Sequence, residues 1–281
     1  MAISPNRLRP WADLVFHVMA HVRPRGPSAA SVFDPVYVAF AEKALGPASS
    51  RHLEEDARIL GRIIATHESL VAVQMLAWLF PTLPAALSCA PFELGQLPPA
   101  ASADPSLLPV LARHAQAAEI LWASALLESE HHAALPQVEC DEDGVGRALA
   151  AIEVCAPRLR SCTVAFVRAL RLRGRVFRGE IWVGTPCGSL ALDADHVAWQ
   201  ASHEASVLEV TEAANAVGVS LAHPRLEHAA VVLLASRAAD CGMSAQHARW
   251  LTHLESGAPC PEQRSLGPEE ATVVERILSQ A

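Results

Sequence analysis

Histidines at helical spacing are the residues of this chain best suited to chemistry. The sequence holds 13 histidines among 281 residues, and neutral imidazole is the commonest protein ligand of transition metals. Asp13, His17 and His21 are separated by four residues each, so in a helix they share one edge. Because two imidazoles one turn apart can bind a single ion, this spacing predicts metal ligands at His17 and His21.

A second group of histidines lies beside a glutamate in the C-terminal half. His196, Gln200 and His203 share one face of a predicted helix, and a glutamate, Glu204, follows directly. In zinc hydrolases with an HExxH motif, the glutamate is the general base beside a zinc-bound water. Val207 replaces the second histidine of that motif. We therefore predict His196 and His203 as metal ligands and Glu204 as a catalytic residue, with further ligands supplied by other helices.

His228 lies on the next predicted helix and completes the predicted ligand set. If this helix pairs with the preceding one as an antiparallel hairpin, His228 approaches the face that carries His196 and His203. The predicted cofactor is a divalent transition metal, zinc or iron, bound between helices. This prediction requires that histidines far apart in the sequence meet at one point.

The corresponding function is that of a metal-dependent enzyme or a metal-binding helical protein. Such a site would activate water or dioxygen on a small substrate or peptide, as in a hydrolase or an oxygenase. A carboxylate-bridged di-metal bundle is less well matched, because it requires two Glu-x-x-His pairs and only Glu128 and His131 stand out. Phosphate-loop, dinucleotide-binding and serine-hydrolase motifs are absent from the sequence.

Three alternatives need no metal. The histidines can be ordinary core residues that bond to their neighbours. The chain can be a non-catalytic accessory protein that docks a partner protein through a run of five arginines: Arg168, Arg171, Arg173, Arg175 and Arg178. It can also form a pocket for an apolar small molecule, lined by tryptophan and methionine side chains.

Composition restricts the class of protein and its partners. Apolar residues make up 51% of the chain and charged residues 19%, which indicates a folded core rather than disorder. A net charge of -8 without a dense basic stretch argues against nucleic acid as a partner. No uncharged apolar segment reaches membrane-spanning length. Seven scattered cysteines without a CxxC pair favour reduced thiols, and we expect a cytoplasmic protein.

Helical periodicity and helix breakers predict the elements that must position these side chains. We expect helices over residues 11–22, 37–45, 51–80, 107–131, 145–154, 158–172, 193–217, 224–242, 244–255 and 268–280. A strand signal appears only around residues 175–192, where a turn at residues 185–188 predicts a β-hairpin.

The predicted fold is therefore mainly α, a bundle-like globular arrangement of many helices with one small hairpin at about residues 175–192. An acidic, glycine-containing segment at residues 141–144 suggests a boundary. It would separate an N-terminal helical half, residues 1–140, from a C-terminal half, residues 141–281, that contains the hairpin. The alternative is one continuous domain.

Overall fold

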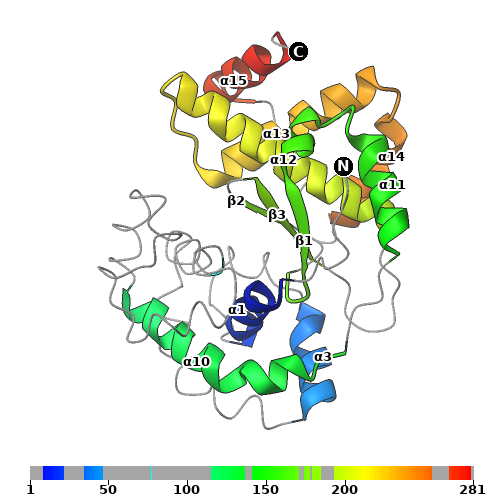
Figure 1. Ribbon diagram of the computed structural model, residues 1–281. Helices are drawn as coiled ribbons and strands as arrows, with labels where there is room; N and C mark the ends of the chain where they lie inside the picture. The colour runs from blue at the N-terminus through cyan, green and yellow to red at the C-terminus, as the bar shows by residue number, and fades with distance from the viewer. Residues whose placement is uncertain are drawn as a thin grey trace.

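Helices make up most of the described chain and lie at both ends of a small sheet (Figure 1). The computed structural model describes residues 9–21, 35–46, 77, 115–136, 141–170, 174–177, 179–184, 193–254 and 266–279. The helices in these ranges are α1 (Pro10–His21), α3 (Pro35–Leu45), α10 (Ala115–Ala133), α11 (Glu142–Ile152), α12 (Ala194–Ala216), α13 (His223–Asp240), α14 (Ser244–Leu254) and α15 (Pro268–Leu278). The predicted mainly α fold is confirmed.

The sheet has three strands in the order β1-β3-β2. They are β1 (Thr163–Val167), β2 (Gly174–Phe177) and β3 (Glu180–Gly184). Strand β3 pairs in parallel with β1 and antiparallel with β2. The β2–β3 pair is a hairpin inside the predicted region, but it turns at Gly179, whose φ of 80° suits glycine, so residues 176–183 do not form the single strand that the predicted turn at residues 185–188 requires. The turn predicted at residues 185–188 lies outside the described residues.

One predicted helix, residues 158–172, is wrong. The chain forms a short 3-10 helix at Pro157–Ser161 and then enters β1. The strand sequence TVAFV is rich in β-branched residues, and its last three residues are buried. Such side chains fit a pleated surface, and pairing with β3 outweighs the weak helical periodicity of this segment.

The other predicted helices within the described residues are present, with ends that differ by a few residues, and residues 107–114 of the helix predicted at residues 107–131 lie outside the described residues. Helix α12 begins where the sequence predicts a cap: the Asp193 carboxylate accepts the backbone N–H groups of Asp195 and His196. The long helix predicted at residues 51–80 lies outside the described residues, apart from the helical Ala77.

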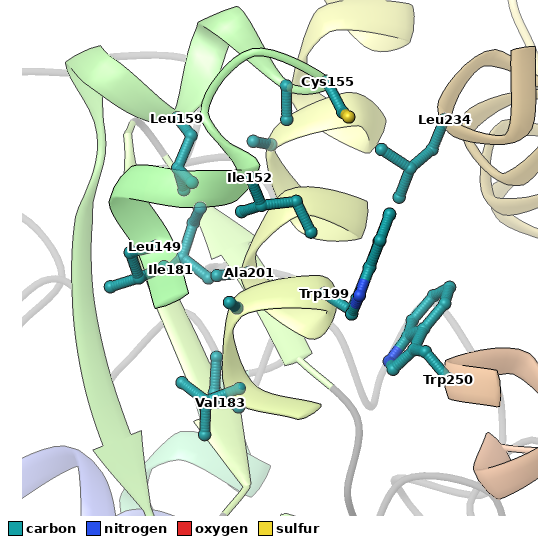
Figure 2. Packing of buried hydrophobic residues seen from close by; sticks show 14 of the residues in the cluster. Leu149, Ile152, Cys155, Leu159, Ile181, Val183, Trp199, Ala201, Leu234 and Trp250 are labelled. Atoms are coloured by element: carbon teal, nitrogen blue, oxygen red, sulfur yellow. The ribbon is translucent and has the colours of Figure 1, made fainter. Parts of the chain in front are cut away.

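Helix α12 is at the centre of the C-terminal part and packs against α11, α13 and the sheet. Figure 2 shows Ile152 of α11 and Leu234 of α13 directed towards Trp199 of α12 in the buried apolar cluster. At the other end of the sheet, α1 packs through Phe16, whose ring meets Trp182 of β3 edge to face at 5.5 Å. The sheet thus joins two helical groups.

Contacts cross the predicted boundary between residues 140 and 141. Asp13 of α1 forms an ion pair with Arg168, which directly follows β1. The division into two halves stays a prediction. Within the described ranges, none of the helices combines the length and the hydropathy that a membrane span requires.

Candidate functional site

Helix α1 carries three ionisable side chains into the protein interior. Every residue from Trp11 to His21 is buried, including Asp13, His17 and His21. Polar groups in such a position need bonding partners, because burial removes their hydration. The predicted edge of α1 therefore faces neighbouring elements instead of solvent.

Asp13 is bonded to two residues that are more than a hundred positions away. Its Oδ2 accepts the Arg168 Nε–H at 2.6 Å and lies 2.9 Å from His132 Nε2, and its Oδ1 accepts the Arg168 backbone N–H at 2.5 Å. Arg168 also donates from Nη1 to the Pro136 carbonyl at 3.0 Å. This buried network joins α1, the end of α10 and the end of β1.

The network determines the charge of Asp13. Burial alone would raise the pKa of this carboxyl. The hydrogen bond with His132 and the charges of Arg168 and His132 outweigh burial, so the pKa of Asp13 lies below its usual value. Asp13 is therefore ionised at neutral pH and balances the buried guanidinium of Arg168.

His17 is fully buried one turn further along α1 and has a different environment. Its Nδ1 lies 2.9 Å from the Tyr37 hydroxyl of α3. Its Nε2 has no hydrogen-bond partner among the described residues and lies 3.8 Å from Glu128 Oε2 of α10. Glu128 is also fully buried. A fully buried imidazole nitrogen thus faces a fully buried carboxylate at a distance too long for a hydrogen bond.

The protonation of His17 follows from its surroundings. Burial lowers its pKa well below the usual value, and the charges of His21, His132 and Arg168 lower it further. The ring is therefore neutral at neutral pH. In the tautomer whose Nδ1–H donates to Tyr37, Nε2 carries a lone pair directed at the Glu128 side.

Two more imidazole rings lie beside that of His17. The His21 ring centroid lies 4.3 Å from that of His17, and the His132 centroid lies 5.1 Å away. His21 Nδ1 bonds the His17 carbonyl at 2.9 Å. We call Asp13, His17, His21, Glu128 and His132 the α1–α10 cluster. Among the described residues, no group of three or more His, Cys, Asp or Glu side chains is arranged so that it could hold a metal ion.

The second predicted group is a separate cluster on α12. Glu204 Oε1 accepts the Gln200 Nε2–H at 2.9 Å and lies 3.1 Å from His203 Nδ1. The Glu204 side chain fits against Gly174 of β2, where an added Cβ would lie 2.4 Å from Glu204 Cγ. The carboxylate is thus held by its own helix and by the edge of the sheet.

Aromatic rings of α14 cover this part of α12. The Trp250 ring lies 5.7 Å from the rings of both His203 and His247. Burial, followed by the nearby charge of His203, lowers the pKa of His247 to about 4. Trp199 and Trp250 also border a small cavity of about 120 Å³ with a charged rim that includes Asp195 and Arg249.

The remaining two predicted ligands lie apart from each other. His196 borders the cavity beside Trp199 at the start of α12. His228 lies on α13 near Glu270, which forms a bidentate pair with Arg225. The structure therefore brings His17 and His21 together and places His203 beside Glu204. Figure 1 shows α1 and α12, which carry these two groups, at opposite ends of the sheet. Among the described residues, no ligand group joins them or His228 into one site.

Sequence reasoning missed Glu128, His132 and Arg168 as parts of the first group. Glu128 and His132 are four residues apart and share one face of α10, a signal as strong as the spacing of His17 and His21. One of the five arginines predicted to form a docking surface, Arg168, is buried in the Asp13 network and so cannot contribute to that surface.

Comparison with known proteins gives no further guide: no family model, no curated protein and no solved structure matches this chain.

Proposed function

We propose that the α1–α10 cluster binds a divalent transition metal and that the protein acts through this ion. His17 Nε2 and the Glu128 carboxylate are the first two ligands, and His21 is the third. The observation that carries the proposal is the 3.8 Å separation of His17 Nε2 and Glu128 Oε2, both fully buried.

A cation between His17 Nε2 and Glu128 Oε2 would remove the electrostatic repulsion between them. In the tautomer whose Nδ1–H donates to Tyr37, the lone pair of Nε2 faces the buried Glu128 carboxylate and the two repel, and no hydrogen bond spans 3.8 Å. Zinc bonds nitrogen and carboxylate oxygen at roughly 2.0–2.2 Å, so two of its tetrahedral ligands lie about 3.3–3.6 Å apart. The observed separation of 3.8 Å is slightly longer, so a small side-chain movement would bring both atoms within bonding distance of one ion.

The surroundings of His17 fit a metal ligand. Ligating histidines donate their second ring N–H to a neighbouring acceptor, which fixes the ring and its tautomer. The Tyr37 hydroxyl, 2.9 Å from His17 Nδ1, is such an acceptor. The low pKa of His17 favours the neutral form that a metal requires.

The proposed activity is that of a metal-dependent hydrolase or oxygenase, in which the ion activates water or dioxygen. Glu204 has no part in this proposal, because its carboxylate is engaged by Gln200 and His203 on α12. The sequence-based set of five histidines is thereby reduced to His17 and His21, with Glu128 added.

The test is a titration of metal-free protein with Zn(II) and Fe(II), followed by competition with a chelator. We expect one tight site in the unmodified chain. His17→Ala and Glu128→Gln should each remove it, because each takes away a ligand. His228→Ala serves as the matched control, since it removes a histidine near Glu270 and should leave the site intact.

Folding of each variant is checked by circular dichroism before the titration. Loss of the site in His17→Ala with retention in His228→Ala supports the proposal. A protein that takes up no ion, or a site that survives both His17→Ala and Glu128→Gln, overturns it.

A further inference from the structure

Three sulphur atoms meet where the chain leaves α11 and where α13 ends. The Cys155 thiol lies 3.6 Å from the Met243 thioether, and the Cys241 thiol is close enough to raise the pKa of Cys155. Cys155 follows α11 by three residues, Cys241 is the C-cap of α13, and Met243 comes two residues later. Two segments distant in the sequence thus place two thiols and one thioether together.

The sulphur cluster lies at the edge of the core. Cys155 is fully buried and belongs to the apolar cluster around α12, whereas Cys241 and Met243 are partly buried and pack against it. Figure 2 shows the Cys155 sulphur on the side that faces α13. The cluster is therefore shielded on one side and accessible from the other.

The Cys155 thiol is not an activated nucleophile. Burial, followed by the contact with Cys241, raises the pKa of Cys155 to about 12. A thiol with so high a pKa is protonated at neutral pH and reacts slowly with electrophiles.

We propose that Cys155, Cys241 and Met243 form a binding site for a soft monovalent cation, Cu(I). Thiolate and thioether sulphur select Cu(I) over harder ions. Three sulphurs bonded to one ion at about 2.3 Å, the length of a zinc–thiolate bond, would lie about 4 Å apart in a plane. The 3.6 Å between Cys155 and Met243 sulphurs is close to this spacing without a change of backbone.

Each Cu(I) ion that binds displaces two protons from the site. Each cysteine thiol loses its proton to solvent and bonds the ion as a thiolate, and Met243 contributes a neutral lone pair. The product carries one net negative charge. The positive charge of Arg237 lies near Cys155, and its own carboxylate partner is Glu209, at 2.7 and 2.8 Å. This site is independent of the divalent site proposed for the α1–α10 cluster.

The test is an anaerobic titration of the full chain with Cu(I) against a chromogenic chelator. Four further cysteines lie outside the described residues: Cys89, Cys140, Cys187 and Cys260. The measured quantity is therefore the difference in tightly bound Cu(I) between variants. Cys155→Ser and Cys241→Ser should each lose one equivalent, and Met243→Leu should weaken that equivalent.

Cys162→Ser is the matched control. Cys162 is also buried, but its thiol bonds the Arg158 carbonyl, so this variant should retain the full complement of Cu(I). Equal Cu(I) binding by the unmodified chain and by Cys241→Ser overturns the proposal, as does equal loss in Cys162→Ser.

Alkylation mapping gives a second measurement in the unmodified chain. Cu(I) should protect Cys241 from iodoacetamide, because Cys241 is the more exposed of the two thiols. Unchanged alkylation of Cys241 with bound Cu(I), or recovery of Cys155 and Cys241 as a disulfide under the same anaerobic conditions, also contradicts the site.

Discussion

Asp13 shows what residue spacing can and cannot predict. The repeat of four predicted that Asp13, His17 and His21 share one edge of a helix, and the structure places all three in the interior. The partners of Asp13 are His132 and Arg168, which lie 119 and 155 residues away. No local pattern encodes such a pairing, because it depends on how α10 and β1 pack against α1.

The buried pair of Asp13 and Arg168 predicts a large loss of stability when one partner is neutralised. Asp13→Asn keeps the shape of the side chain but removes the carboxylate charge that the buried guanidinium of Arg168 pairs with at 2.6 Å. We expect the free energy of unfolding to fall by about 3–5 kcal/mol. Urea denaturation at pH 7 measures this difference.

The exposed ion pair between Arg147 and Asp141 is the control for the buried pair between Asp13 and Arg168. Arg147 and Asp141 lie 3.9 Å apart with three quarters of the arginine side chain exposed. Arg147→Gln should change the free energy of unfolding by about 0–1 kcal/mol. If the two variants are equally stable, the Asp13 network does not hold the elements together as described.

At the scale of elements, periodicity predicted helices well and strand β1 poorly. The helices bordered by proline, glycine or a capping aspartate, such as α12 and α13, have nearly the predicted ends. β1 has only five residues, and its identity depends on pairing with β3, which follows it in the chain. A short segment carries too little periodicity to reveal a partner strand.

The contact of α12 with β2 predicts a coupled effect of two substitutions. Gly174→Ala places a Cβ 2.4 Å from Glu204 Cγ, so the carboxylate must move. We expect a cost of about 1–3 kcal/mol in unfolding free energy. In a Glu204→Ala background the space is vacant, and the cost of Gly174→Ala should fall by roughly 1 kcal/mol or more in a double-mutant cycle. Additive costs would show that the two residues do not touch.

The packing of α14 on α12 predicts a dependence on pH. His247 is buried against Trp199 and Trp250, and its pKa is lowered to about 4. The unfolded chain binds a proton at this histidine below about pH 6.5, whereas the folded chain does not. Stability from this group is therefore present above pH 6.5 and lost as the pH falls towards 4.

His247→Phe removes this titration and keeps a ring in the same place. Between pH 7 and pH 4.5 the variant should lose less unfolding free energy than the unmodified chain, by about 1–2 kcal/mol. Denaturation series at several pH values measure the two slopes. Parallel curves would mean that His247 is not held neutral in the folded state.

At the scale of the whole molecule, the sheet separates the two groups of histidines that the sequence suggested (Figure 1). His17 lies on α1 at one end, and His203 lies on α12 at the other. Spacing within each helix predicted the local grouping. It carried no information on which helices meet, because that is decided by long-range packing such as the contact of Phe16 with Trp182.

Binding of an ion at the α1–α10 cluster should stabilise the entire fold. The proposed ligands come from α1 and α10, so the proposed site would exist only in the folded chain. At a free Zn(II) concentration 100 times the dissociation constant, the gain is about 2.7 kcal/mol. Thermal unfolding should shift upward for the unmodified chain and for His228→Ala, and should not shift for His17→Ala. An equal shift in all three would place the ion elsewhere.

The most direct measurement is anomalous diffraction from crystals of the zinc-loaded protein, recorded on both sides of the zinc absorption edge. One strong peak is expected at about 2.0–2.2 Å from both His17 Nε2 and a Glu128 carboxylate oxygen. A zinc peak at any other position, with only a water molecule between His17 and Glu128, would contradict it.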